Sequence, residues 1–154
     1  YTNFTYWTQH CWGVTCVNDM EAMLSYLPIT IGDKEQALAD LVRCYEKMMM
    51  RSHTNGGYVN LLDECWKMCE KFHTNIVIMY DHVSCKNVGG LHGLFEDQAR
   101  ERGIHLIWIP HDVMDPRTVS RREMREAFSQ YMVTVLNEKP LDPTLLDYED
   151  ALSW

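Results

Sequence analysis

The chain has 154 residues, of which 22 are acidic and 14 are basic, so its formal net charge is −8 with neutral histidines. This excess of negative charge argues against a nucleic-acid-binding protein, because phosphate contacts need a basic surface. No apolar run approaches the roughly 20 residues that a membrane-spanning helix needs, and the N-terminus lacks the basic segment of a signal peptide. We therefore expect a single cytoplasmic domain over residues 1–154, with no nucleic-acid or membrane partner.

The start of the chain and its cysteines bear on its origin. The first residue is Tyr1 instead of an initiator methionine, so we expect a fragment of a longer protein. The six cysteines are spread over segments with regular periodicity, whereas domains built on disulfides are usually shorter and richer in loops. We expect free thiols in a reducing compartment.

Hydrophobic periodicity and turn residues divide the chain into helical and extended segments. In chain order we expect an aromatic strand or extended segment at 1–12, a short helix at 19–27, helices at 34–51 and 58–72, a strand at 76–79, a helix at 88–102, a strand at 104–109, a helix at 120–137 and an extended tail with two prolines. Asp33 and Ser120 precede helices as caps, with Gln36 and Glu123 as their capping-box partners, and Gly103 follows a helix as its terminator.

Apolar residues at helical spacing predict which side chains of each helix face the core. These stripes are Leu38, Leu41, Tyr45 and Met48; Tyr58, Leu62, Cys65, Cys69 and Phe72; Val88, Leu91, Phe95 and Ala99; and Met124, Phe128, Tyr131 and Val135.

The segment from residue 76 to residue 109 has the order strand, helix, strand. Such a unit has parallel strands and a right-handed crossover, and helices on both sides would complete a three-layer α/β sandwich with a mainly parallel, Rossmann- or flavodoxin-like sheet. Ligands of such sheets bind outside the carboxyl ends of the strands. The residues at those ends are 80–87 and 110–117.

Cys85 lies on the first of these turns, where the next helix opens. The positive end of a helix favours the thiolate, which ligates metals and attacks electrophiles. Cys85 is therefore a candidate ligand or nucleophile, and otherwise a small residue packed at a turn. Leu91 stands where a phosphatase loop would need arginine, so that enzyme class is set aside. His82 and His111 fall at the two strand ends and could converge on one site, although the histidines form no zinc-binding pattern.

Other candidates have a structural interpretation beside a functional one. Cys65 and Cys69 fall on an apolar stripe, so we expect them to be buried, reduced and without metal. The roles of Cys11, Cys16 and Cys44 stay open. An arginine cluster at the start of the last helix is either a site for an anion or partner, or a solvated face paired with Glu123 and Glu126. Its members are Arg117, Arg121, Arg122 and Arg125.

Two motifs follow the two strands of the unit. Val83-Ser84-Cys85-Lys86 follows the first, and Asp112-Val113-Met114-Asp115-Pro116-Arg117 follows the second. In this order they resemble the C-terminal domain of the benzoyl-CoA reductase / 2-hydroxyacyl-CoA dehydratase family, where a strand ends in a Ser-Cys-Lys-like turn and the next strand ends in an acidic Asp-x-x-Asp-Pro-Arg turn. The resemblance covers about residues 76–136.

The resemblance implies an iron–sulfur protein. Members of the family are paired homologous subunits that carry a 4Fe–4S cluster or a related centre, and a separate ATP-hydrolysing activator supplies one low-potential electron for dehydration or ring reduction of an acyl-CoA. It implies that Cys85 is a cluster ligand, while the other ligands lie in an N-terminal domain that this chain lacks, so the fragment would be inactive alone and hold no cluster. Residues implied as contacts to substrate or partner are His82, Lys86, His111, Asp112 and Arg117.

Two interpretations from other classes stay open. The chain could be a non-catalytic assembly or partner-binding domain that uses its aromatic N-terminus and Pro-rich tail as an interface. Alternatively, it could be a thiol-dependent enzyme with Cys85 as its nucleophile.

Overall fold

The computed structural model describes residues 2–20, 27–48, 51, 56–115 and 117–147. The chain divides into two compact units, one made of Tyr1–Cys16 with Asn75–Trp154 and the other of Val17–Thr74. Among the described residues, no helix is both long and apolar enough to cross a membrane.

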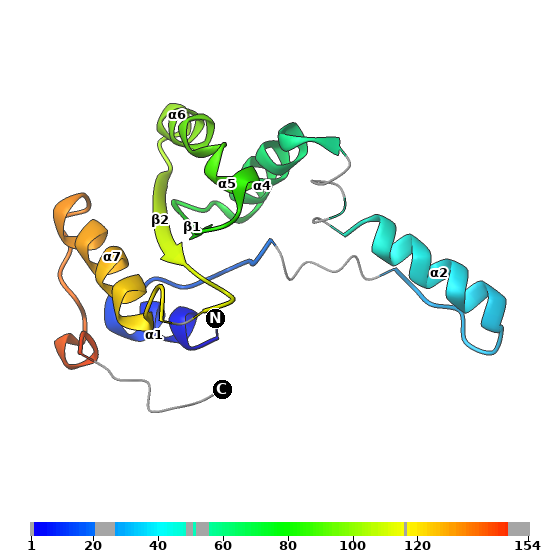
Figure 1. Ribbon diagram of the computed structural model, residues 1–154, viewed down its shortest axis with the longest axis horizontal. Coiled ribbons are helices and arrows are strands. Elements are labelled where there is room, and N and C mark those ends of the chain that lie inside the picture. The colour runs from blue at the N-terminus through cyan, green and yellow to red at the C-terminus, as the bar shows by residue number, and fades with distance from the viewer. Residues whose placement is uncertain (1, 21–26, 49–50, 52–55, 116, 148–154) are drawn as a thin grey trace. The chain divides into compact units, whose positions relative to one another are not determined.

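The first unit is built on two parallel strands, β1 (Ile76–His82) and β2 (His105–His111) (Figure 1). They pair in register from Ile76 opposite His105 to His82 opposite His111. The connection between them contains the short helix α5 (Lys86–Gly89) and the helix α6 (His92–Arg102). The parallel β–α–β unit predicted from the sequence is therefore confirmed, and the protein is of the α/β class.

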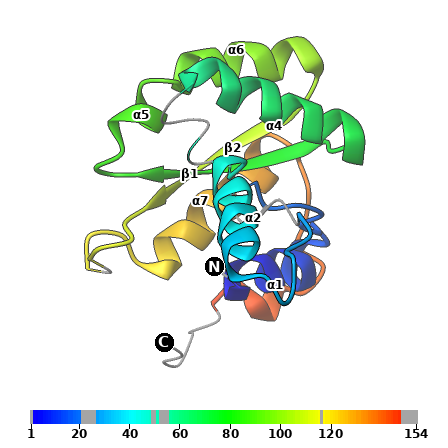
Figure 2. The ribbon, with the colours of Figure 1, turned by 90° about the vertical axis from the view of Figure 1, so that its right-hand side faces the viewer.

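Helices lie on both faces of these strands (Figure 2). Helices α1 (Thr2–Trp12) and α7 (Arg121–Thr134) share one hydrophobic core with β2. Helix α6 packs on the other face, where Phe95 meets the ring of Trp108 edge-on at 6.1 Å. The alternation of a strand explains this division, because Ile107 and Ile109 point to one face and Trp108 to the other.

The core between α1, α7 and β2 is rich in aromatic side chains. Phe128 is fully buried, and its ring lies 5.9 Å from Phe4, 5.8 Å from Trp7 and 6.5 Å from Trp12, in edge-to-face geometry each time. Edge-to-face packing is the favoured arrangement of aromatic pairs. This cluster packs α1, at the start of the chain, against α7, which lies in its C-terminal part.

The prediction of a strand or extended segment at residues 1–12 is wrong, because α1 covers Thr2–Trp12. Phe4, Trp7 and Cys11 recur at helical spacing, and all three are buried in the core. Burial of one helical face outweighs the β-propensity of aromatic residues and threonines, which is itself strongly context-dependent.

The tail packs against α1. The short 3-10 helix η1 (Pro143–Leu145) lies in it, and the indole N–H of Trp7 donates to the carbonyl of Leu145 at 2.8 Å. The backbone N–H of Leu141 donates to the carbonyl of Cys11 at 2.7 Å. The second bond satisfies a carbonyl at the end of α1, which has no partner within the helix.

The ends of several elements agree with the capping signals. Ser120 and Glu123 form a reciprocal capping box at the start of α7, and Gly103 ends α6 with a left-handed φ of 65°. Other boundaries differ from the prediction. Both strands run on to the histidines His82 and His111, the helix expected at 88–102 is divided into α5 and α6 at Gly90, and α7 ends at Thr134 instead of near residue 137.

The second unit contains α2 (Lys34–Glu46) and α4 (Tyr58–Phe72). The bounds of α4 are those predicted, and Leu62, Cys65 and Cys69 are buried as expected, whereas Tyr58 and Phe72 are exposed. The helix expected at 19–27 falls mainly on residues 21–26, outside the part of the chain that the structure describes.

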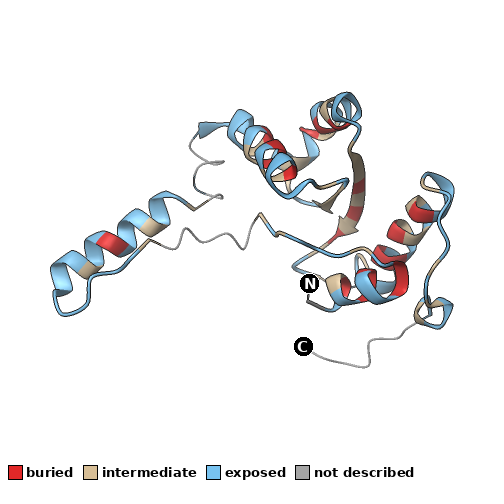
Figure 3. Cartoon of the chain, turned by 180° about the vertical axis from the view of Figure 1, so that it is seen from behind, coloured by how far each residue is buried: buried red, intermediate tan, exposed pale blue. Residues whose placement is uncertain are grey.

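The core stripe predicted for the first of these helices is wrong, and α2 ends at Glu46 instead of near residue 51. Leu38 is 48% exposed and Tyr45 is 65% exposed, and α2 is almost entirely pale blue in Figure 3. The buried residue of α2 is Asp40, whose carboxylate accepts the backbone N–H of Thr30 at 2.8 Å and pairs with Arg43. Polar contacts with the preceding loop therefore anchor this helix, and its apolar stripe faces outward.

The aromatic core gives the first testable prediction. We expect Phe128→Ala to lower the free energy of unfolding by about 3–5 kcal/mol, because it removes a fully buried ring and leaves a cavity. Urea denaturation of the 154-residue chain measures this loss. Val133→Ala on the same helix changes a side chain that is 52% exposed and should alter stability by less than about 0.5 kcal/mol. Equal effects of the two substitutions would contradict the described core.

Candidate functional site

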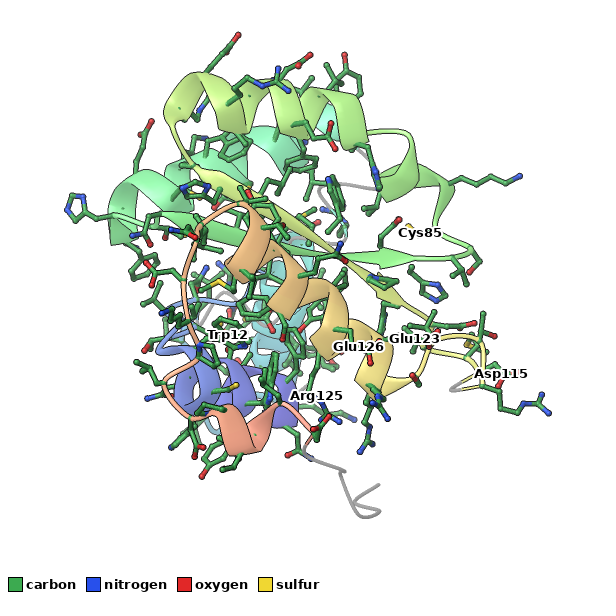
Figure 4. The ribbon with its side chains drawn as sticks, turned by 90° about the vertical axis from the view of Figure 1, so that its left-hand side faces the viewer. Trp12, Cys85, Asp115, Glu123, Arg125 and Glu126 are labelled. Atoms are coloured by element: carbon green, nitrogen blue, oxygen red, sulfur yellow. The ribbon has the colours of Figure 1, made fainter. Side chains whose placement is uncertain are left out.

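The parallel pairing brings two turns to one edge of the strands. His82 and His111 end β1 and β2 opposite each other, and the backbone N–H of Val83 donates to the carbonyl of His111 at 3.1 Å. Figure 4 shows Cys85 and Asp115, one from each turn, at the same end of the strands. This is the edge at which α/β sheets bind ligands.

Cys85 lies on the first turn as the residue that precedes α5. Its backbone N–H donates to the carbonyl of His82 at 2.9 Å, and its carbonyl accepts the N–H of Gly89 at 3.0 Å. These two bonds hold the residue between the end of the strand and the short helix. The side chain is half-buried, while its neighbours Ser84 and Lys86 are exposed.

The two histidines at the strand ends lie close together. Their ring centres are 5.8 Å apart with an interplanar angle of 79°, and the ring of His111 also lies 5.4 Å from Tyr80. Burial lowers the pKa of His111 below its usual 6.5, and the neighbouring His82 lowers it further through charge repulsion. The backbone N–H of Ser84 points to Nδ1 of His82 at 3.3 Å.

The turn after β2 is held by its own carboxylates. Oδ1 of Asp112 accepts the backbone N–H groups of Met114 at 2.8 Å and Asp115 at 3.2 Å. The bond from Met114 is the main reason why the pKa of Asp112 lies below its usual value. The guanidinium of Arg117 forms a two-pronged pair with Asp115, at 2.9 Å from Nε to Oδ1 and 2.8 Å from Nη2 to Oδ2. Asp112 and Arg117 therefore shape this turn, and Arg117 lies exposed at its tip.

The other five cysteines differ in their burial. All six carry free thiols. Cys11 is buried in the core between α1 and the tail, and burial, with the negative charge of Asp142, raises the pKa of its thiol. Cys65 and Cys69 are buried on α4, as predicted. Cys16 is exposed, and the Cys44 thiol lies 3.9 Å from the carbonyl of Leu27.

These positions test the iron–sulfur cluster that the resemblance implies. Such a cluster needs about four ligands, mostly thiolates. Cys85 supplies one thiol at the strand ends, and within the described residues no group of three or more His, Cys, Asp or Glu side chains could hold a metal ion. The described part of the chain therefore does not provide the ligand set of a cluster.

The arginines at the start of α7 divide between two environments. Arg122 pairs with Glu126 at 2.9 Å, as expected for a solvated face, and lies 3.9 Å from Asp147. Arg125 is buried instead, which the solvated-face interpretation did not anticipate. Figure 4 shows both Glu126 and Arg125 on α7.

Sequence reasoning missed a group on the opposite face of the strands. Nε2 of His92, the first residue of α6, lies 3.2 Å from Oδ1 of Asp81 in β1. The imidazole stacks on the indole of Trp108 with 3.7 Å between ring centres and 14° between planes. The alternation of β1 could have revealed Asp81, since it places this carboxylate on the face opposite to His82.

We found no protein-family model, curated protein or solved structure that matches this chain.

The depressed pKa of His111 makes stability depend on pH. Between the pKa of the folded state and 6.5, the unfolded chain binds more protons, so the free energy of unfolding rises with pH. The contribution of neutral His111 to the free energy of unfolding is fully present above pH 6.5. It is lost as the pH falls from 6.5 to the pKa of the folded state. We expect His111→Asn to flatten this dependence, as measured by urea denaturation at a series of pH values between about 5 and 7.

Val133→Ala is the control for this experiment, because it changes an exposed aliphatic side chain of α7 that carries no titratable group. It should leave the pH dependence as it is in the unaltered chain. An identical slope in the unaltered chain and in His111→Asn would contradict the prediction.

Proposed function

We propose that this chain is the C-terminal, cluster-liganding domain of a subunit of an ATP-activated radical 2-hydroxyacyl-CoA dehydratase or benzoyl-CoA reductase. The observation that supports this most is the common edge of its two motifs. The turn with Ser84-Cys85-Lys86 and the turn from Asp112 to Arg117 both lie at the carboxyl ends of the paired strands. If the two motifs form one site, as the resemblance implies, their two turns must lie at the same edge of the sheet.

The architecture proposed with this function is larger than the two strands described. We infer that the sheet of the whole subunit is a mainly parallel, Rossmann- or flavodoxin-like sheet in a three-layer sandwich. The presence of α1 and α7 on one face and α6 on the other supports this, because parallel sheets are covered on both faces. A sheet of two strands is also smaller than independently stable sheets usually are.

Within the proposal, Cys85 supplies one thiolate, and the remaining ligands come from outside the described residues. When bound, the 4Fe–4S cluster would supply a low-potential electron to the thioester of an acyl-CoA. His82 and Lys86 flank Cys85, and His111 lies 5.8 Å from His82 between ring centres, so these groups can contact an anionic substrate or partner. The proposed partners are an N-terminal domain, a homologous second subunit and an ATP-dependent activator.

A second candidate function is partner binding without catalysis. Its support is the outward-facing stripe of α2, where Leu38, Leu41, Val42 and Tyr45 are all exposed. Exposed apolar side chains at helical spacing are typical of a helix that docks against another protein. This function needs no cysteine, so the iron content of the protein separates the two candidates.

Cys85→Ser tests the first candidate in the complete polypeptide that contains this chain, purified without oxygen. We expect iron and acid-labile sulfide in the unaltered protein and loss of most of both in the variant, because one ligand is removed with little change in packing. The measurement is the iron and sulfide content per polypeptide, with circular dichroism to confirm that the fold is retained.

Cys44→Ser is the matched control, since Cys44 is also half-buried but lies on α2. It should keep the full iron content. Iron that is retained in Cys85→Ser, or absent from the unaltered protein, would remove the support for a cluster-liganding domain and favour partner binding.

A further inference from the structure

The beginning of α6 is joined to both strands by one side chain. The His92 ring stacks on Trp108 of β2 at 3.7 Å, and its Nε2 lies 3.2 Å from the carboxylate of Asp81 of β1. The second contact is not aligned as a hydrogen bond, and it is a charge attraction only while His92 is protonated. Both partners are about one-third exposed, at 33% for the His92 side chain and 39% for that of Asp81, so solvent weakens this attraction.

The contact between Asp81 and His92 closes the loop that carries Cys85. The loop leaves β1 after His82, forms α5 and returns to the sheet at the start of α6. Its two ends therefore meet at this side-chain contact, which restricts the conformations that the loop can adopt.

A series of backbone hydrogen bonds connects this contact to Cys85. The N–H of Phe95 donates to the carbonyl of Leu91, and the N–H of Leu91 donates to the carbonyl of Val88, both at 2.9 Å. One turn earlier, the N–H of Gly89 donates to the carbonyl of Cys85 at 3.0 Å. A displacement of the first turn of α6 therefore reaches the residue that precedes α5.

We propose that His92 and Asp81 are positioning residues that hold the Cys85 turn in place from the opposite face of the strands. Phe95 and Leu91 are buried and attach α6 to its face without them. His92 adds the contact to β1, which sets the first turn of α6 relative to the strand from which the Cys85 loop departs. Only the purpose of the positioned thiol rests on the proposed function, because the arrangement itself involves no cofactor.

The test is the rate at which iodoacetamide alkylates Cys85 in the 154-residue chain, resolved from the other thiols by peptide mass spectrometry. We expect His92→Ala to accelerate it roughly fivefold, because the turn opens more often once the stack on Trp108 and the contact with Asp81 are lost. His92→Phe keeps a ring on Trp108 and should restore part of the slow rate. Asp81→Asn should accelerate the reaction by less than His92→Ala does.

The double variant Asp81→Asn with His92→Ala should react no faster than His92→Ala alone, since both substitutions remove one interaction. Two controls separate positioning from general loosening. His10→Ala removes another stacked histidine, from Tyr6 at 3.9 Å on α1, and should leave the Cys85 rate unchanged. Phe128→Leu destabilises the core on the other face and should also leave it unchanged.

Two results would overturn the proposal. One is an unchanged Cys85 rate in His92→Ala, and the other is the same acceleration in Phe128→Leu as in His92→Ala. Either result would leave the iron measurement on Cys85→Ser unaffected, because alkylation is followed without any cluster. The failure of one proposal is thus distinguishable from the failure of the other.

Discussion

The register between β1 and β2 is the constraint on which the first unit depends. A shift of one residue would turn every side chain of a strand to the other face. It would move Ile107 and Ile109 out of the aromatic core and bring Trp108 into it, away from α6. The same register sets His82 opposite His111 and so brings the two following turns together. The register that the core selects therefore also decides which residues meet at the strand ends.

The core that fixes this register contains residues of α1, near the start of the chain, and of α7, in its C-terminal part. Trp7 near the start of the chain contacts Phe128 on α7 and donates a hydrogen bond to Leu145 in the tail. These contacts bridge large sequence separations, so tertiary packing holds α1, α7 and the tail together. Phe4, Trp7 and Trp12 of the N-terminal segment are buried in the core, whereas Tyr6 in that segment and Leu141 in the tail are exposed.

The titratable groups at the strand ends differ in the hydrogen bonds and ion pairs that they make within the chain. Asp112 binds backbone N–H groups of its own turn, and Asp115 binds Arg117. His111 is buried, and its depressed pKa keeps it neutral near pH 7. Asp112 keeps its negative charge beside His111, and exposed Lys86 adds a positive charge on the first turn.

Local signals in the sequence determined the parts of the fold that depend on neighbours in the chain. The capping box of Ser120 and Glu123, the glycine stop at Gly103 and the bounds of α4 each follow from hydrogen bonding or periodicity within a few residues. The order strand, helix, strand likewise indicated parallel pairing, and with it the common edge of His82, Cys85 and His111.

Only the tertiary structure decided what depends on distant contacts. Residues 2–12 form a helix because Phe4, Trp7 and Cys11 find a core supplied by β2 and α7. The apolar stripe of α2 faces outward because Asp40 anchors the opposite side of that helix to the loop before it. The contact of His92 with Asp81 and Trp108 arises from register and helix placement together. Periodicity shows which side chains share a face, but burial depends on which element arrives to cover that face.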